Sequence, residues 1–473
     1  MGSLTIRTIK SVGESLIAVK NAALVTNRLM LQRVHDKMKG FLPQNEEQEI
    51  QINNTDKQNF SSSSQEILPP IKHFVVLMLE NQSFDRMLGF LKQDMPELEG
   101  LTGTENNPVN PADPSSPIVK VYPPTGKNIY VTADPGHLVP DVVEQVYGSR
   151  SPAPDAKPKM NGFISNFMRQ PGVQEENAKR VMECLLPSQV PVLSTLAKNF
   201  LVCDHWFSSL SGPTWPNRFF FHAGTSDGHI ETPGYDFKGE LQTAKAAADK
   251  YDMNTIFNRF QEKGISWKIY QGDIGLTDLL SKVTPFKKNF YIYHRFLRDA
   301  RRGALPTYSF IEPRYFDLPS PFNKNKHIIK ANDQHPPHDV RDGEKLIAEV
   351  YNTLRNSPSW KNTLLMIVYD EHGGYYDHVP PPPAVNPDGK THPDFPRAFD
   401  TFGLRVPAIL ISPWVKQGVD HTIYDHTSFI RTMEKKFNLE PLTKRDASAN
   451  TFEHNFLPEP RNDTPKQIGF PKN

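Results

Sequence analysis

The chain has 473 residues, with 54 Lys and Arg against 53 Asp and Glu, which gives a formal net charge of +1 at neutral pH. This balance argues against a nucleic-acid-binding protein, because such proteins carry an excess of basic residues. The 43 prolines and the charged fraction of 23% are typical of a soluble globular protein with long surface loops. The only cysteines, Cys184 and Cys203, exclude a disulfide framework, and we favour two reduced thiols in an intracellular protein over a single bridge.

The first 68 residues differ in composition from the rest. Residues 1–39 contain seven basic and two acidic residues, and apolar side chains recur there at helical spacing. We therefore expect a basic amphipathic helical segment at 1–43 and a disordered, solvated linker at 44–68. The helix could lie on an anionic membrane or pack on the folded domain. No run is long and apolar enough for a signal peptide or a transmembrane segment, so we expect a cytoplasmic protein, with peripheral membrane association through residues 1–39 as one alternative.

From residue 69 onwards, stretches typical of strands alternate with stretches typical of helices. Expected strands are 73–79, 200–203, 265–270, 307–311, 363–369 and 406–411. Expected helices are 83–91, 191–198, 253–263, 343–356 and 426–437, with Asp342 as the N-cap of the fourth. This alternation predicts an α/β fold with a central, mostly parallel sheet and helices on both faces. We expect one catalytic domain at 69–440, an insertion or cap at 100–160 over the carboxyl edge of the sheet, and a C-terminal extension at 441–473.

Two apolar runs end abruptly in pairs of oxygen ligands. The run 74–79 is followed by Glu80 and Asn81, and the run 364–369 by Asp370 and Glu371. Parallel strands buried on both faces carry their ligands at their carboxyl ends, so these four side chains should converge at one edge. Three carboxylates would repel one another there without a cation, and their oxygens suit a hard divalent ion such as Ca²⁺ or Mg²⁺. The alternative is a pair of strand ends with solvated acids.

A loop after the second strand holds a candidate nucleophile. Thr214 lies between Pro213 and Trp215 and precedes Pro216, in backbone stiff enough to aim one hydroxyl. A threonine hydroxyl is a poor nucleophile at neutral pH, but coordination to a divalent metal lowers its pKa. Asn217 and Arg218 follow as candidate substrate-binding residues. Taken alone, the segment favours a proline-rich turn with structural hydroxyls over a nucleophile.

Several histidines fall in expected loops. Imidazoles near a phosphate can donate the proton of a leaving group or stabilise an oxyanion, although a single loop histidine is more often a hydrogen-bonding residue. His335 and His338 are the stronger candidates, because Pro336 and Pro337 fix their separation. The other candidates are His137, His372 and His426.

Five ordered motifs resemble one known family. They are ENQSFD at 80–85, GPTWPNR at 212–218, NDQHPPH at 332–338, YDEHGGYYDH at 369–378 and RVPAILISP at 405–413. Together they resemble the phosphoesterase family of bacterial and plant non-specific phospholipases C and related acid phosphatases, over roughly residues 71–437. The resemblance implies an alkaline-phosphatase-like α/β sandwich. It also implies metal ligands at Glu80, Asn81, Asp370 and Glu371, a nucleophile at Thr214, and phosphate-facing histidines at His137, His335 and His338.

The chain departs from the family pattern at Gln82, where the first motif usually has arginine, which removes a positive charge beside the expected site. The threonine nucleophile and the Asp-Glu-His sequence at 370–372 resemble the phospholipase branch, while the longer C-terminal region of many phospholipases looks reduced here.

These features lead to one main hypothesis for function. We expect a metal-dependent phosphoester hydrolase that cleaves glycerophospholipids to diacylglycerol and a phosphorylated headgroup through a phosphothreonine. A histidine of the His335/His338 pair would protonate the leaving oxygen, and Asn217, Arg218, His372 and His426 would bind substrate. The alternatives are a phosphomonoesterase of the acid phosphatase type and a non-catalytic membrane-surface protein.

Overall fold

The computed structural model describes residues 69–126, 128–153, 155–232, 251–273, 275–319 and 328–471. The expected basic segment at 1–43 and linker at 44–68 lie outside the described residues. The chain divides into two units. Of the first, Met1–Gln65 with Leu318–Ile329, only the short antiparallel pair β8 (Leu318–Pro319) and β9 (Ile328–Ile329) is described. The second unit comprises Glu66–Asp317 with Lys330–Asn473 and contains the main sheet.

An eight-stranded sheet in the order β12-β4-β11-β10-β1-β7-β5-β6 forms the centre of this unit. Neighbouring strands are parallel except at β11, which runs antiparallel to both β4 and β10. The mostly parallel sheet predicted from the sequence is therefore confirmed. The strands are β1 (His73–Leu79), β4 (Leu201–Cys203), β5 (Trp267–Gln271), β6 (Phe290–Ile292), β7 (Tyr308–Glu312), β10 (Thr363–Tyr369), β11 (Ala408–Ile411) and β12 (Gly418–Asp420).

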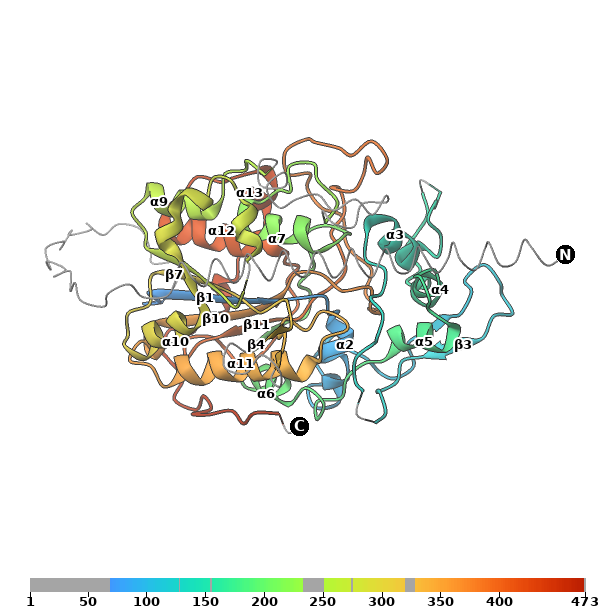
Figure 1. The fold of residues 1–473 in the computed structure, drawn as a ribbon, viewed down its shortest axis with the longest axis horizontal. Coiled ribbons are helices and arrows are strands. Elements are labelled where there is room, and N and C mark those ends of the chain that lie inside the picture. Colours follow the sequence, from blue (N-terminus) through green and yellow to red (C-terminus); the bar gives the residue numbers. More distant parts are fainter. Residues whose placement is uncertain are drawn as a thin grey trace, which may run out of the picture. The chain divides into compact units, whose positions relative to one another are not determined.

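Helices cover both faces of the sheet, as expected (Figure 1). One face carries α6 (Pro191–Asn199), α10 (Tyr293–Arg301) and α11 (Val340–Arg355). The other face carries α7 (Thr214–Ala223), α9 (Ile256–Glu262) and α12 (His426–Phe437), with α13 (Lys444–Ser448) against α12. The remaining helices are α2 (Phe84–Leu88), α3 (Val139–Tyr147), α4 (Phe163–Met168) and α5 (Glu175–Ala178).

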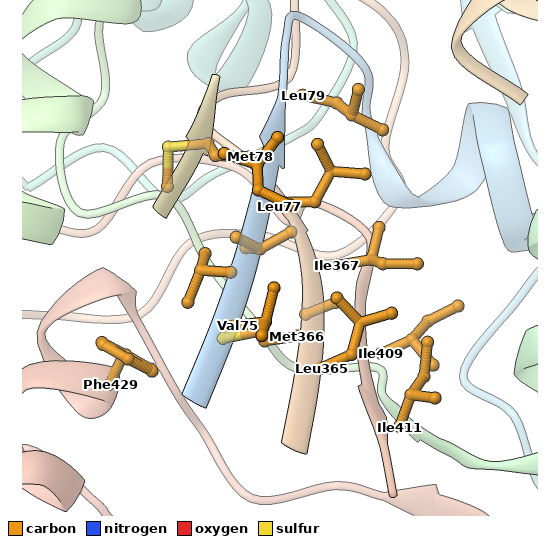
Figure 2. Packing of buried hydrophobic residues seen from close by; sticks show 14 of the residues in the cluster. Val75, Leu77, Met78, Leu79, Leu365, Met366, Ile367, Ile409, Ile411 and Phe429 are labelled. Atoms are coloured by element: carbon orange, nitrogen blue, oxygen red, sulfur yellow. The ribbon is translucent and has the colours of Figure 1, made fainter. Parts of the chain in front are cut away.

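The core lies on both sides of the central strands. Residues 74–79 of β1 and all of β10 and β11 are buried, which explains why their sequences are continuously apolar rather than alternating. Figure 2 shows side chains of these three strands packed together, with Phe429 of α12 approaching from one face. Since both faces are covered, the polar residues that follow the apolar runs emerge only where the strands end.

Two predicted helix boundaries need correction. Asp342 is not the N-cap of α11: the helix begins at Val340, and Asp339 is the N-cap, accepting a hydrogen bond from the backbone N–H of Arg341 at 3.0 Å. Both acids suit a helix N-terminus, Asp339 by capping and Asp342 by its charge in the first turn, so the sequence pattern did not separate them. The predicted helix 83–91 ends earlier, at Leu88, and continues as a 3-10 helix at Gly89–Gln93.

Most of the expected insertion at 100–160 is described. It contains a two-stranded ribbon of β2 (Asn106–Pro108) and β3 (Ile118–Lys120), followed by α3. Its apolar residues form a cluster with others from the loop after β10, including Tyr375. Gln145 of α3 accepts a hydrogen bond from His372 Nε2 at 2.8 Å, so the insertion contacts the carboxyl edge of β10. Its boundaries as a cap remain a prediction.

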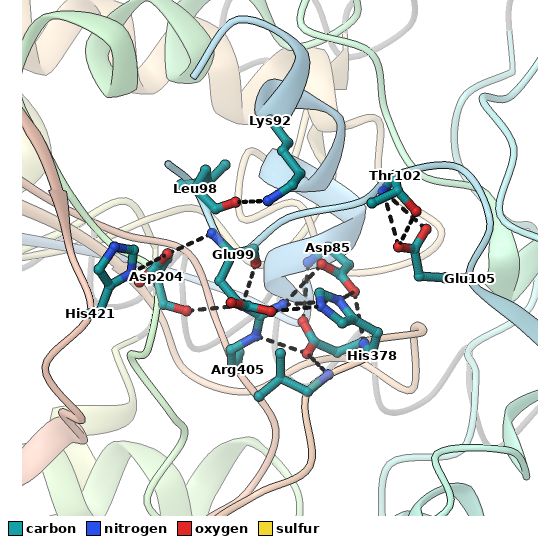
Figure 3. Close-up of polar contacts among 12 residues, drawn as sticks. Asp85, Lys92, Leu98, Glu99, Thr102, Glu105, Asp204, His378, Arg405 and His421 are labelled. Atoms are coloured by element: carbon teal, nitrogen blue, oxygen red, sulfur yellow. Dashed lines mark hydrogen bonds and ion pairs between the residues drawn. The ribbon is translucent and has the colours of Figure 1, made fainter. Parts of the chain in front are cut away.

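A buried ion network joins the loops that follow β1 and β10 (Figure 3). The Arg405 guanidinium contacts Asp85 through Nη2 and Asp377 through Nε, each at 2.9 Å. His378 Nδ1 lies 2.7 Å from the second oxygen of Asp85. Asp85 follows the Glu80-Asn81 pair and Asp377 follows the Asp370-Glu371 pair, so the network holds both acidic segments at one edge of the sheet.

We predict that this network makes stability depend on pH through His378. Burial lowers the pKa of His378, but attraction to Asp85 outweighs it and raises the pKa to about 9. A histidine with a raised pKa stabilises the folded state fully below its unfolded pKa of 6.5, and this contribution is lost as the pH rises through about 9. The difference in free energy of unfolding between the wild type and His378→Gln should therefore be larger near pH 6 than near pH 10, as measured by denaturant titration. A difference that does not change with pH would contradict the assignment.

Candidate active site at the carboxyl edge of the sheet

The predicted metal ligands and nucleophile meet at one edge of the sheet. Glu80 and Asn81 follow β1, Asp370 and Glu371 follow the adjacent parallel strand β10, and Thr214 is the first residue of α7. The backbone N–H of Asn81 donates to Asp370 Oδ1 at 3.0 Å. The Thr214 hydroxyl donates to Asn81 Oδ1 at 3.1 Å. The nucleophile candidate therefore touches one of the four predicted ligands directly.

Asn81 adopts a backbone conformation that is unusual for a residue other than glycine. Its φ is 55°, in the left-handed region, and such strain concentrates at functional sites. The loop after β10 packs so closely against it that a Cβ on Gly373 would lie 2.1 Å from the Asn81 carbonyl oxygen. Only glycine fits at position 373, where φ is also positive. The two ligand-bearing loops are thus interlocked through their backbones.

Arg218 lies one helical turn after Thr214 and is almost fully buried. Its Nε lies 3.0 Å from Asp370 Oδ2, and its Nη2 lies 3.2 Å from Glu80 Oε1. The Nη1 atom has no hydrogen-bond partner among the described residues. Arg218, expected to bind substrate, therefore holds two predicted metal ligands and keeps one buried donor available.

Burial of these acids is electrostatically unfavourable. Burial raises the pKa of Asp370 to about 6, with repulsion from Glu371 adding to the shift and Arg218 opposing it. Burial likewise raises the pKa of Glu80 well above its usual value, against the attraction of Arg218. The Arg218 guanidinium faces Asp370 and Glu80, whereas His137 and His372 lie beside Glu371 and lower its pKa against the effect of burial. A divalent cation would compensate negative charge that remains at Asp370 and Glu80.

The donor set fits a divalent ion. Glu371 Oε1 is buried without a hydrogen-bond partner among the described residues, whereas Oε2 accepts from the backbone N–H of Gly373 at 2.7 Å. An unpaired carboxylate oxygen in a buried position is costly unless it binds something. Glu80, Asn81 and Asp370 bring further oxygen donors of the kind that Ca²⁺ or Mg²⁺ prefers to the same strand edge. Among the described residues the ligand atoms of these three carboxylates do not close into one cluster, whereas those of Asp134, His137 and His335 do.

Three of the predicted histidines lie beside this site: His137, His335 and His338. The Nδ1 atoms of His137 and His335 donate to the carbonyl oxygens of Pro135 and Pro336 at 2.8 and 2.6 Å. Each therefore has Nε2 free for another partner. The two rings are perpendicular, with centroids 6.0 Å apart. His338 Nδ1 instead donates to Asp333 Oδ1 at 2.7 Å.

Asp134 lies between His137 and His335. Its carboxylate is 3.7 Å from His137 Nδ1 and 4.0 Å from His335 Nε2, and the three side chains are close enough to hold a metal together. Burial lowers the pKa of His335, but attraction to Asp134 and Glu80 outweighs it and raises the pKa to about 9. The pKa of His137 is raised for the same reasons, with Asp134 and Glu371 as the partners. The His335 imidazole thus favours the protonated form at neutral pH.

The other predicted substrate-binding residues are occupied by protein contacts. His426 donates from Nε2 to the Asp370 carbonyl oxygen at 2.7 Å and accepts at Nδ1 from Trp206 Nε1 at 3.3 Å. Asn217 Oδ1 accepts from the backbone N–H of Leu210 at 2.9 Å, and its Nδ2 donates to carbonyl oxygens of the same loop. His372 contacts Gln145 and Glu371. In these positions the three side chains hold the loops of the site in place through hydrogen bonds.

Thr214 does not lie in a loop, as the sequence suggested, but at the start of α7. Pro213 occupies the N-cap position, and Pro216 fits because the first turn of a helix leaves its N–H groups without intrahelical partners. The Thr214 hydroxyl thereby stands at the positive end of a helix dipole, which favours negative charge nearby. Sequence analysis also gave no role to Asp134 or Asp333, although each is an acid close in sequence to a candidate histidine.

Comparisons with known proteins show which family the chain belongs to. Residues 71–440 match the model of the Phosphoesterase family. The non-specific phospholipase C1 of Arabidopsis thaliana is 41% identical over 429 residues, which cover 86% of this chain and 75% of that protein. The non-hemolytic phospholipase C of Pseudomonas aeruginosa is 27% identical over 419 residues, covering 79% and 55%.

Solved structures match more weakly. A protein of the alkaline phosphatase superfamily from Vibrio parahaemolyticus gives a TM-score of 0.32 at 14% identity, covering 56% of this chain and 67% of that one. Murine ectonucleotide pyrophosphatase/phosphodiesterase 5 gives 0.35 at 10% identity, covering 57% and 95%. Scores this low carry no argument by themselves.

The sequence matches carry the assignment of class. They show a hydrolase that acts on phosphoric ester bonds. The chain belongs to the Phosphoesterase family, which confirms the resemblance drawn from the five motifs. Among the described residues, no helix is long and apolar enough to cross a membrane.

We predict that Glu371→Gln loses the metal without unfolding the protein. The change keeps the shape of the side chain but weakens its one unpaired oxygen as a ligand, and even indirect changes around a metal cost about 10-fold or more in affinity. Elemental analysis of purified protein should show the loss. Glu312→Gln is the matched control, because Glu312 is equally buried at the end of β7 but bonded to Leu276, Thr277 and Tyr315. Equal metal content in the Glu371 variant and the wild type would contradict the site.

Proposed function

We propose that this hydrolase cleaves glycerophospholipids in the manner of a phospholipase C, releasing diacylglycerol and a phosphorylated headgroup through a phosphothreonine at Thr214. The names of the relatives, non-specific and non-hemolytic phospholipases C, support the choice of substrate. The observation that carries the chemistry is the contact of the Thr214 hydroxyl with Asn81 at 3.1 Å, at a helix N-terminus and beside three buried carboxylates.

The divalent ion would be held by Glu80, Asn81, Asp370 and Glu371, and its charge would lower the pKa of a neighbouring hydroxyl and offset the charge of the phosphate. The Thr214 hydroxyl gives up its proton to solvent, and Oγ then attacks phosphorus in line with the diacylglycerol oxygen, so that the Oγ–P bond forms as the P–O bond to diacylglycerol breaks. The dipole of α7 and the unpaired Arg218 Nη1 stabilise the charge that develops on the phosphoryl oxygens.

The leaving oxygen needs a proton, and His335 is the proposed donor. Its Nδ1 is bound to the Pro336 carbonyl, so Nε2 is the atom that gives the proton. Asp134 and Glu80 keep the ring protonated at neutral pH. In the second half of the reaction, His335 Nε2 takes a proton from the attacking water, and the phosphorylated headgroup leaves as the P–Oγ bond breaks. His338, bonded to Asp333, is the alternative donor.

Asn217, His372 and His426 act in this proposal as positioning residues rather than as substrate ligands. His426 fixes the carbonyl of Asp370, and Asn217 ties together the loop that leads to Thr214. Arg218 combines both roles, because two of its nitrogens hold carboxylates while Nη1 has no partner among the described residues.

We predict that Thr214→Ala abolishes turnover while metal content is unchanged, whereas Thr214→Ser retains part of the rate because its hydroxyl survives. Rapid quenching followed by peptide mapping should find phosphate on residue 214. The substrates are a mixture of phospholipids and a generic aryl phosphate, with products identified by mass spectrometry. Full activity of Thr214→Ala would overturn the covalent mechanism, and turnover of the aryl phosphate alone would favour a phosphomonoesterase.

The basic segment at 1–39, which lies outside the described residues, is the proposed membrane contact. Its net charge of +5 from seven basic and two acidic residues would gain about 1 kcal/mol per Lys or Arg near an anionic surface.

We predict that deletion of residues 1–68 weakens binding to anionic vesicles, with a dependence on salt, and slows hydrolysis of bilayer lipid. The rate on a soluble short-chain phospholipid should stay the same. Vesicle sedimentation and both kinetic assays test this. An equal loss on the soluble substrate, or a truncated protein that does not fold, would show that the segment belongs to the folded core.

A further inference from the structure

Gln82, the residue at which the chain departs from the family's first motif, is buried beside the site but does not face it. It is 1% exposed, and its Nε2 donates to the backbone carbonyl oxygen of Gln334 at 2.7 Å. That carbonyl belongs to the peptide plane that Gln334 shares with His335. Gln82 therefore holds the peptide bond from which His335 extends.

Gln334 is clamped in an unusual conformation. Its φ is 75°, and its side chain accepts from the Tyr369 hydroxyl and donates from Nε2 to the Val340 carbonyl oxygen at 2.7 Å. The backbone N–H of Glu80 also donates to the carbonyl oxygen of Asp333 at 2.9 Å. The loop before His335 is thus fixed to the end of β1 by two hydrogen bonds, one from Glu80 and one from Gln82.

Arg86, one helical turn after Gln82, sets the orientation of the Gln82 amide. Its Nε donates to Gln82 Oε1 at 2.9 Å, and since a guanidinium only donates and a carbonyl only accepts, Nε2 of Gln82 must face Gln334. The other two nitrogens of Arg86 donate to the carbonyl oxygens of Glu183 and Ile129, each at 2.7 Å. Its guanidinium lies 3.9 Å from the centre of the Tyr375 ring. Every nitrogen of Arg86 is therefore engaged, and its charge sits beside position 82.

We propose that Gln82 is a positioning residue for His335, since its amide, oriented by Arg86, holds the peptide bond that precedes His335. This inference rests on the proposed function, in which His335 protonates the leaving oxygen. A misplaced proton donor slows the departure of a basic alkoxide much more than that of a phenolate, which leaves without a proton. The loss caused by a change at Gln82 should therefore depend on the leaving group.

The test compares two soluble substrates with the same headgroup, a short-chain phosphatidylcholine and p-nitrophenyl phosphorylcholine. Gln82→Met, which removes both hydrogen bonds at similar volume, should lower kcat/KM, which reports only the steps up to departure of the first leaving group, by about 10- to 100-fold on the phosphatidylcholine and by less than about 3-fold on the phenyl ester. Gln82→Glu, which keeps the acceptor for Arg86 and removes the donor to Gln334, should show the same pattern and serves if the Met variant does not fold.

Asn352→Leu is the matched control, because Asn352 also bonds backbone atoms through both ends of its amide, at Ile468, but lies on α11 away from the acidic loops. It should leave the ratio of the two rates unchanged. His335→Asn shows how far the rates on the two substrates separate when the proton donor is removed. Its effect should not add to that of Gln82→Met. If His335→Asn slows both substrates equally, the proton donor is misassigned and the inference falls with it. If His335→Asn slows the phosphatidylcholine more than the phenyl ester but neither Gln82 variant does so, the positioning role of Gln82 is overturned while the proposed function stands.

Discussion

The in-register pairing of β1 with β10 is the constraint on which the rest of the site depends. The two strands pair in parallel from His73 opposite Thr363 to Leu79 opposite Tyr369, so the next residues along both chains, Glu80 and Asp370, emerge at the same height. The backbone bond from Asn81 to Asp370 then closes the gap between the loops. A shift of one residue would turn the buried side chains to the opposite faces and separate the acids.

Concentrating three buried carboxylates at this edge requires compensation from several directions. Arg218 pairs with two of them, and removing one partner of a buried ion pair typically costs about 3–5 kcal/mol. The left-handed backbone of Asn81 adds strain that the surrounding contacts must offset, whereas Gly373 accepts its positive φ and the close approach of the Asn81 carbonyl without strain. The network of Arg405 with Asp85 and Asp377 supplies such contacts just outside the site. A divalent ion would complete the charge balance.

Much of the fold could be predicted, because strands buried on both faces have an unmistakable continuous apolar pattern, as in β1 and β10. The direction of β11 could not be predicted, since side-chain alternation is the same in parallel and antiparallel strands. Nor could the helical state of Thr214, because prolines at the start of a helix look like prolines in a turn. The histidine roles came from motif and resemblance, and their protonation depended on Asp134, which no pattern singled out.

The sequence by itself determined which residue types end the apolar runs, and hence the class of chemistry: paired oxygen ligands, a hydroxyl, a guanidinium and histidines in a fixed order. Only the tertiary structure decided which of these side chains face the site and which brace it. Asn217 and His426 carry the same polar groups as any substrate ligand, yet their partners are backbone atoms and Trp206. Hydrogen-bonding capacity is a property of the residue, whereas its use depends on which groups the fold brings within about 3 Å.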